Sequence, residues 1–299
     1  IDYVPHGMNT EVFHPIIVED LEFTALKKQA GVEDKDFVLF FNSRNIRRKQ
    51  IPDTMLAWKY FLDKLPKEKA DKCVFILHTE LVSDHGTDLQ AVASYIFGEN
   101  SPNIKFSTNK LSTQHLNYLY NLADAQILLT SNEGWGLSLT EALLTGTPII
   151  ANVTGGMQDQ MRFEDKNGDW IDFDADIPSN HTGAYKKHGK WAFPVFPNNR
   201  SLVGSPPTPY IWDDRCCAED AAKQIMKVYK MDSNKREKLG KAGYKWAISD
   251  EAGFTSKHMS ERVITSLDKL FNTWTPRNHY ELINISEIKE DVLPHKLLY

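Results

Sequence analysis

The chain has 299 residues, of which 41% are hydrophobic and 25% charged, with a net charge of −5. This composition is ordinary for a globular protein with one large core or two modest ones, and the acidic balance argues against nucleic acid as a partner. No apolar run approaches the roughly 18–20 residues of a membrane span. Only three cysteines occur, including the neighbours Cys216 and Cys217, which indicates a reducing compartment, so we expect a cytoplasmic protein.

Short apolar segments alternate with amphipathic segments between Phe37 and Ala151. The expected strands are 37–41, 73–78, 104–106, 125–129 and 148–151, and the expected helices are 52–65, 88–97, 112–121 and 137–145. Apolar strands separated by helices predict an α/β fold with a Rossmann-like, doubly wound parallel sheet. Ligands of such sheets bind beyond the carboxyl ends of the strands, so the loops that follow the strands are the places to search for a site.

The segment from about 157 to 215 breaks this alternation because it is rich in Pro, Gly, Asn, Asp and aromatic residues. We expect an irregular insertion with short strands near 170–173 and 191–196. Its aromatic residues form either a lip over an acceptor cleft or, as we favour, a small core of their own: Tyr185, Trp191, Phe193, Phe196, Tyr210 and Trp212. Helices are expected again at 218–229, 234–248 and 251–272. The predicted domain is therefore 1–275, followed by a C-terminal arm at 276–299.

The most informative segment is 131–150, in which seven residues separate Glu133 from Glu141. A glycine-flanked turn, Gly134-Trp135-Gly136, lies between them and leads into a helix that begins at Leu137. A helix that starts on a glycine turn offers free N–H groups and a positive dipole end to an anion. We expect Glu133 on the turn and Glu141 in the first helical turn to face that anion. Carboxylates in such a place suit a ligand that also carries hydroxyls, as a nucleotide-sugar does.

A cluster of cations follows the first expected strand, where the same carboxyl edge is expected: Arg44, Arg47, Arg48 and Lys49. Arginine offers a bidentate fork to phosphate oxygens and lysine a point charge. Together they could neutralise a diphosphate leaving group. The alternative is a solvated basic loop.

These segments resemble the C-terminal, donor-binding half of retaining GT-B glycosyltransferases of group 1 (the family 4 type), which includes glycogen-synthase-like enzymes. In that family Gly-Arg, followed five residues later by Lys, holds the diphosphate, and this chain has Ser43-Arg44 and Lys49 at that spacing. The family's E-x7-E motif corresponds to Glu133 and Glu141. Two further segments also resemble the family: 4–15 resembles the hinge that leads into this half, and 154–156 resembles the glycines after the next strand.

The resemblance implies a hexosyltransferase that takes a glycosyl group from a UDP-, GDP- or ADP-sugar and keeps the anomeric configuration. It implies no metal and no other cofactor. The implied catalytic residues are Arg44, Lys49 and Glu133. The implied donor-binding residues are Glu141, Gly134, Trp135, Gly136 and Leu137, with Ser107, Asn109 and Lys110 against the nucleobase. Trp135 either lines the sugar pocket or caps the core.

The first residue is Ile1 rather than Met, and the opening reads like the middle of a protein, so we expect a fragment. The resemblance implies an upstream N-terminal domain that carries the acceptor site, and the acceptor (glycan, lipid or protein) is not indicated. We therefore expect this chain alone to bind a nucleotide-sugar without useful transfer. Any contact with a membrane would be made through the missing half.

Other interpretations remain open at this stage. One is a sugar-nucleotide epimerase on the same fold, and another is a non-catalytic binding or scaffold module. A phosphorylase would need a lysine-bound pyridoxal phosphate, which no sequence context marks. Asp172, Asp174 and Asp176 imitate an Asp-x-Asp metal motif but fall in the irregular segment, where we expect them to be solvated. The spacing of three histidines matches no metal-ligand pattern: His78, His85 and His115.

Overall fold

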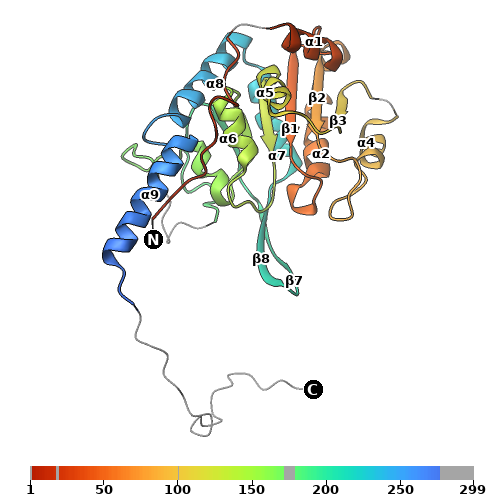
Figure 1. The fold of residues 1–299 in the computed structure, drawn as a ribbon. Helices are drawn as coiled ribbons and strands as arrows, with labels where there is room; N and C mark the ends of the chain where they lie inside the picture. Colours follow the sequence, from red (N-terminus) through yellow and green to blue (C-terminus); the bar gives the residue numbers. More distant parts are fainter. Residues whose placement is uncertain (1, 18–19, 100, 172–178, 277–299) are drawn as a thin grey trace, which may run out of the picture.

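The computed structural model describes residues 2–17, 20–99, 101–171 and 179–276 (Figure 1). Within these residues one six-stranded sheet has the strand order β3-β2-β1-β4-β5-β6, and every neighbouring pair is parallel. The strands are β1 Phe37–Asn42, β2 Cys73–His78, β3 Ile104–Ser107, β4 Ala125–Leu128, β5 Ile149–Asn152 and β6 Ala192–Val195. The expected α/β, Rossmann-like class is confirmed.

The centre of this sheet is where a ligand crevice should form. β1 pairs with β2 on one side, from Phe37 beside Cys73 to Asn42 beside His78, and with β4 on the other. The order of strands therefore reverses between β1 and β4, and in open α/β sheets ligands bind outside the carboxyl ends of the strands at such a point. Residues 37–41 of β1 are all buried, as expected for a central strand covered on both faces.

The helices pack in two groups. In the first group α2 contacts both α4 and α7, and in the second α6 contacts both α5 and α8. Their bounds are α1 Leu21–Ala30, α2 Ile51–Leu62, α3 Lys67–Ala70, α4 Leu89–Phe97, α5 Thr113–Leu122, α6 Leu137–Leu144, α7 Ala218–Tyr229, α8 Ser233–Ala247 and α9 Ser256–Thr273. Three short 3-10 turns complete the list: Arg47–Lys49, Gly155–Met157 and Asp159–Met161.

Most helix limits follow local capping. Ser112 caps α5 with its hydroxyl, and Asp88 caps α4 with its carboxylate. α9 begins at Ser256 rather than at the expected 251, because the Thr255 side chain accepts a hydrogen bond from the N–H of His258 and starts the helix there. α1 and α3 were not expected from the sequence.

In the segment expected to be irregular, residues 157–171 and 179–215 contain more regular structure than the sequence suggested. β6 joins the main sheet, with Phe193 beside Ile150 of β5, and its Pro194 is tolerated because β6 is an edge strand. β7 Asn199–Ser205 and β8 Thr208–Arg215 form an antiparallel hairpin, which projects beyond the edge of the sheet in Figure 1. The aromatic residues do not behave as one group: Trp191 and Phe193 are buried in the main core, Tyr185 and Phe196 pack against it, and Tyr210 and Trp212 are exposed on β8.

α9 lies along one side of the molecule, beside the start of the chain (Figure 1). Lys269 pairs with Asp2 at 2.7 Å there. Among the residues described above, no helix combines the length and the apolar character that a bilayer crossing needs. Asp172, Asp174 and Asp176, which we expected to be solvated rather than to bind a metal, lie outside the described residues, as do residues 277–299 of the C-terminal arm.

Candidate functional site

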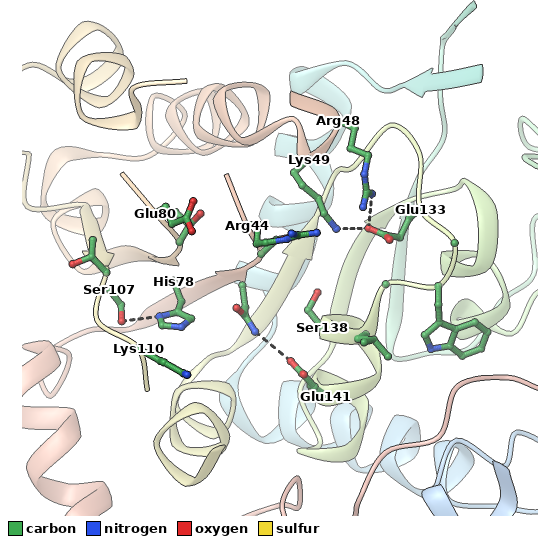
Figure 2. Close-up of a pocket in the computed structure, with 18 of the residues that line it drawn as sticks. Arg44, Arg48, Lys49, His78, Glu80, Ser107, Lys110, Glu133, Ser138 and Glu141 are labelled. Carbon is green, nitrogen blue, oxygen red and sulfur yellow. Dashed lines mark hydrogen bonds and ion pairs between the residues drawn. The ribbon is translucent and has the colours of Figure 1, made fainter. Parts of the chain in front are cut away.

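A cavity of about 800 Å³ opens at the carboxyl ends of the strands, between the loops that follow β1 and β4 (Figure 2). It has a cationic wall from the loop after β1 and an acidic wall from the turn after β4. The third side is formed by the loop after β3. All the site residues expected from the sequence line it: Arg44, Lys49, Ser107, Asn109, Lys110, Glu133, Gly134, Trp135, Gly136, Leu137 and Glu141.

The cationic wall contains one exposed and one buried cation from the expected pair. Arg44 is exposed, and its side chain makes no hydrogen bond or ion pair with any described residue. Lys49 is buried at the end of the 3-10 turn that precedes α2. Arg48 lines both the cavity and a neighbouring hollow, whereas Arg47 lines only that hollow, together with Arg215. The four-cation cluster is therefore divided between two surfaces.

Glu133 on the acidic wall is paired with the cationic wall. Its Oε2 atom accepts from Arg48 Nη1 at 2.9 Å and from Lys49 Nζ (Figure 2). Burial alone would raise the pKa of Glu133, but the ion pairs with Lys49 and Arg48 outweigh it and lower that pKa below its ordinary value. Burial lowers the pKa of Lys49, and Glu133 opposes this change. The sequence motif did not reveal that these two expected site residues contact each other.

Glu141 lies on the opposite side of the cavity. Its Oε2 atom accepts from Tyr120 Oη at 2.5 Å and from Asn42 Nδ2 at 3.2 Å. Burial raises the pKa of Glu141, and these two hydrogen bonds oppose the rise. Glu141 is the fifth residue of α6, not part of its first turn as expected, because the helix begins at Leu137 directly after Gly136.

Two glycines with positive φ angles shape the glycine turn, one within the turn itself and one in the loop after β5 that packs against it. Gly136 caps α6 in the left-handed region, with φ of 86°. Gly155, after β5, has φ of 50°, and a Cβ there would lie 1.9 Å from the carbonyl oxygen of Glu133. Gly156 donates its N–H to that same oxygen at 3.3 Å. Because Gly155 and Gly156 lack a Cβ, the loop after β5 can pack directly against the backbone of Glu133 and hydrogen-bond to it.

Trp135 faces the core more than the cavity. Its side chain is buried, its Nε1 donates to Thr140 Oγ1 at 2.8 Å, and its ring meets the edge of Phe254. Gln160 Nε2 donates to the main-chain oxygen of Trp135 at 2.6 Å. Of the two roles considered for Trp135, these contacts favour the core cap.

The loop after β3 is the polar third side. Ser107 Oγ lies 3.0 Å from His78 Nδ1, and burial lowers the pKa of His78. Asn109 and Lys110 are exposed. Arg48 had been named only as one of the cation cluster. Eight further cavity residues were not singled out from the sequence as site residues: His6, Asn42, Ser43, His78, Thr79, Glu80, Thr108 and Ser138. Six of these eight, all but His6 and Ser138, lie in the loops after β1, β2 and β3 or close the strand before them, so the loop rule could have found them.

The three histidines considered as metal ligands have separate surroundings. His78 contacts Ser107, and His115 contacts Ser112 at the start of α5. No group of three His, Cys, Asp or Glu side chains in the described part of the chain is arranged to hold a metal ion.

Comparison with known proteins assigns the family. A family model described as "Glycosyl transferases group 1" matches residues 22–177, which is just over half of the chain. The chain belongs to this family. With the strand order and the cavity described above, it has the fold of the C-terminal GT-B domain that the motifs suggested.

The chain is also similar to several individual proteins. It is 24% identical over 147 residues to alpha-monoglucosyldiacylglycerol synthase of Acholeplasma laidlawii, a match that covers 49% of the chain and 34% of that protein. Sucrose-phosphate synthase of Thermosynechococcus elongatus has 18% identity and a TM-score of 0.60, covering 90% of the chain and 52% of that protein. The Anabaena protein HepE, solved with UDP-glucose, has 16% identity and a TM-score of 0.60, covering 89% and 57%. The chain thus spans about half the length of these solved proteins and a third of the first.

Proposed function

We propose that the cavity binds a nucleoside diphosphate sugar and that the chain supplies the donor side of a glycosyl transfer. The observation that carries this proposal is the arrangement of Arg44, Lys49, Glu133 and Glu141 around one cavity at the sheet's switch point. Cations suited to phosphate and carboxylates suited to hydroxyls line the same cavity, and a nucleotide-sugar needs both.

The diphosphate is assigned to the cationic wall and the start of α6. Arg44 has a guanidinium free of other described side chains, so it can offer its fork to phosphate oxygens. Leu137 begins a helix on a glycine cap, and its N–H lies at the positive end of the helix dipole. Lys49 would add its charge by turning from Glu133. Donors held in place before the reaction stabilise the charge that develops on the departing diphosphate.

The hydroxyl groups are assigned to the two carboxylates. Tyr120 and Asn42 occupy Oε2 of Glu141, and among the described residues nothing bonds to Oε1, which is left for the ribose. Glu133 likewise keeps Oε1 for the donor sugar. The loop of Ser107, Asn109 and Lys110 is assigned to the nucleobase.

The reaction is proposed to keep the anomeric configuration and to need no metal. The bond between the anomeric carbon and the phosphate oxygen breaks, an acceptor oxygen attacks from the same face, and the acceptor's proton passes to the departing phosphate. An N-terminal GT-B domain is proposed to supply the acceptor side. The relatives above are named for different products, so the proposal leaves the acceptor open.

Uracil is the first base to test, because HepE was solved with UDP-glucose. Calorimetry with UDP, GDP and ADP should detect binding of at least one nucleotide. Arg44→Ala should weaken that binding about tenfold or more, since it removes charge-assisted hydrogen bonds to phosphate. Glu141→Ala should weaken it through the ribose. Arg47→Ala is the matched control, because Arg47 belongs to the same loop but faces the neighbouring hollow.

The proposal fails if none of the three nucleotides binds, or if both cavity variants bind as tightly as the parent chain. Product analysis on the complete protein separates transfer from the epimerase interpretation. An epimerised sugar formed without an acceptor would favour the epimerase.

A further inference from the structure

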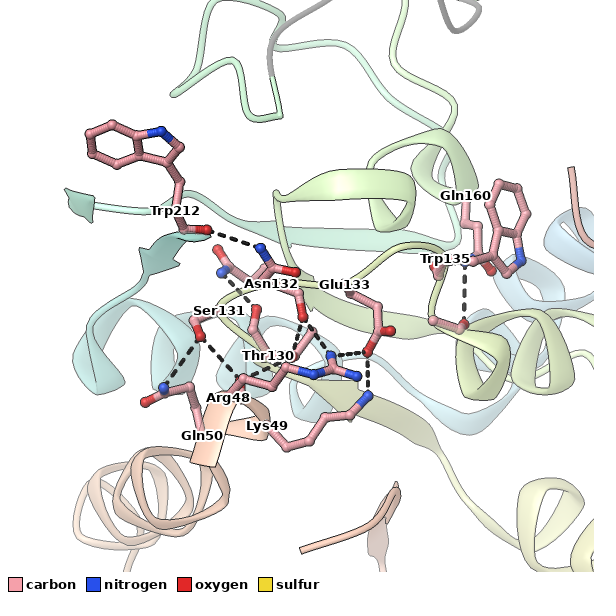
Figure 3. Close-up of polar contacts among 12 residues, drawn as sticks. Arg48, Lys49, Gln50, Thr130, Ser131, Asn132, Glu133, Trp135, Gln160 and Trp212 are labelled. Atoms are coloured by element: carbon pink, nitrogen blue, oxygen red, sulfur yellow. Dashed lines mark hydrogen bonds and ion pairs between the residues drawn. The ribbon is translucent and has the colours of Figure 1, made fainter. Parts of the chain in front are cut away.

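The β7–β8 hairpin is bonded to the turn that carries Glu133, although it lies outside the residues that the family model matches. The N–H of Asp214 donates to the carbonyl oxygen of Ser131 at 2.7 Å. The side-chain amide of Asn132 donates to the carbonyl oxygen of Trp212 at 3.0 Å (Figure 3). The hairpin therefore contacts the back of the acidic wall, on the side away from the cavity.

The base of the hairpin is a fixed point. Asp214 is only 1% exposed, and its carboxylate accepts from Thr154 Oγ1 at 2.8 Å and from Asn180 Nδ2 at 2.5 Å. Its carbonyl oxygen accepts from Asn152 Nδ2 at 2.7 Å. A buried charge is costly unless its hydrogen bonds are satisfied, so this part of β8 resists displacement.

The turn also contacts the cationic wall through Arg48. The carbonyl oxygen of Asn132 accepts from Arg48 Nη1 at 2.6 Å, and the same nitrogen reaches Glu133 Oε2 at 2.9 Å (Figure 3). Thr130 Oγ1 lies between the main-chain oxygens of Arg48 and Asn132, at 2.9 and 3.1 Å. Asn132 thus contacts both sides: its carbonyl oxygen holds the guanidinium of Arg48, and its side-chain amide is hydrogen-bonded to the hairpin.

This arrangement meets a requirement of the donor site. Lys49 carries a single positive charge, so a diphosphate that binds it competes with Glu133 for that charge. If Lys49 turned away and no other cation remained, a largely buried carboxylate would face the anionic ligand unpaired, which is strongly unfavourable. Arg48 is the cation already in place on the same oxygen.

We propose that Asn132 is a positioning residue of the donor site: by joining the turn to the hairpin, it holds Arg48 on Glu133 while Lys49 serves the diphosphate. The inference rests on the proposed function. Asn132 lines neither the cavity nor the neighbouring hollow, so its effect on the ligand must pass through Arg48 and Glu133.

The test is a double-mutant cycle of UDP binding, measured by calorimetry on the whole chain. Asn132→Ala should weaken UDP binding about threefold to tenfold, the range expected for loss of one hydrogen bond. Asn199→Ala is the matched control, because Asn199 is an exposed hairpin asparagine whose side chain is hydrogen-bonded only to Ser201 among the described residues, and it should stay within twofold of the parent. Adding Asn132→Ala to Arg48→Ala should cause little further loss, since both act through one guanidinium.

If the fold-loss in UDP affinity of the double variant equals the product of the two single fold-losses, Asn132 acts independently of Arg48 and the inference is overturned. So would UDP binding by Asn132→Ala that equals the parent's while Arg44→Ala remains weak, a result that leaves the proposed function intact. If the parent binds no nucleotide, the proposed function fails first and this inference with it. Asn132→Ser offers a milder second variant should the alanine variant unfold, and the same outcomes apply to it.

Discussion

At the scale of single residues, the ion pair between Lys49 and Glu133 keeps both side chains charged although little of either is exposed. Both side chains are largely buried, with 11% and 13% of their surface exposed. Each would be unfavourable as an isolated charge, and each is stabilised by the other. Arg48 adds a second cation to the same carboxylate oxygen.

Glu133→Gln should therefore destabilise the chain by about 1–3 kcal/mol at neutral pH, because it leaves the buried ammonium of Lys49 without its carboxylate acceptor. The pKa of Glu133 is lowered in the folded state, so the folded chain binds this proton less tightly than the unfolded chain. The stabilisation is present above the ordinary glutamate pKa and is lost as the pH falls through the lowered one. Urea unfolding at several pH values should show the gap between variant and parent narrowing towards acid.

Glu80→Gln is the control for this experiment, because Glu80 lines the same cavity but is exposed. Its free energy of unfolding should match that of the parent. A gap for Glu133→Gln that is the same at every pH would contradict the assignment of the effect to this ion pair.

Tyr120→Phe should raise the pKa of Glu141 further, because it removes one of the two hydrogen bonds that oppose the effect of burial. If ionised Glu141 accepts ribose hydroxyls, nucleotide binding is lost as the pH falls through its pKa, and the variant should lose binding at a higher pH. Calorimetry against pH measures this shift. Tyr118→Phe, on the same helix but bonded to Asp20, should leave the profile unchanged, and equal profiles for Tyr120→Phe and the parent would refute the idea.

At the scale of elements, the glycine turn and the loop after β5 form one unit. Gly155→Ala combines a left-handed backbone with a Cβ placed 1.9 Å from the carbonyl oxygen of Glu133, so the turn must move. We expect a loss of about 2 kcal/mol or more in the free energy of unfolding. Gly134→Ala, with open space around its Cβ and no positive φ, should keep the parent's stability in the same urea titration. Equal stability of the two variants would show that the support is dispensable.

The sequence predicted those elements whose pattern is local. The apolar runs of β1 and β2 and the capped start of α5 were all readable from composition and spacing. α1 was missed because Phe23 is its only buried residue, which leaves almost no apolar stripe to detect. β6 was read as a strand but not as part of the main sheet, since pairing with β5 depends on contacts distant in the sequence.

The candidate site shows the same division. Loop positions after the strands indicated which residues share an edge of the sheet, and all the expected ones line one cavity. Side-chain pairing within that edge was not predictable, because spacing along the chain does not determine which carboxylate meets which cation. The contact of Glu133 with Lys49, and the link from Asn132 to Trp212, required the three-dimensional structure.

At the scale of the whole molecule, the charge of the cavity differs from that of the chain. The net charge is −5. The cavity gathers four cations against three acids: Arg44, Arg48, Lys49 and Lys110 against Glu80, Glu133 and Glu141. A locally positive hollow on an acidic protein attracts anions over a short range that salt shortens further.

UDP binding should therefore weaken several-fold between low and high salt, because exposed cations such as Arg44 and Lys110 are screened. Uridine, which lacks the phosphates, should bind with an affinity that salt hardly changes. Calorimetry at a series of sodium chloride concentrations measures both. If the affinity for UDP changes with salt as little as the affinity for uridine does, the cationic wall does not hold the diphosphate.

The reversal of strand order between β1 and β4 also bears on how the chain matures. The two walls of the cavity come from segments separated by the whole excursion through β2 and β3, so neither half of the sheet contains a site by itself. A nucleotide should recognise only molecules in which these halves have docked. A bound nucleotide should then slow amide exchange in the central strands, and this protection would report that the two halves of the sheet have come together.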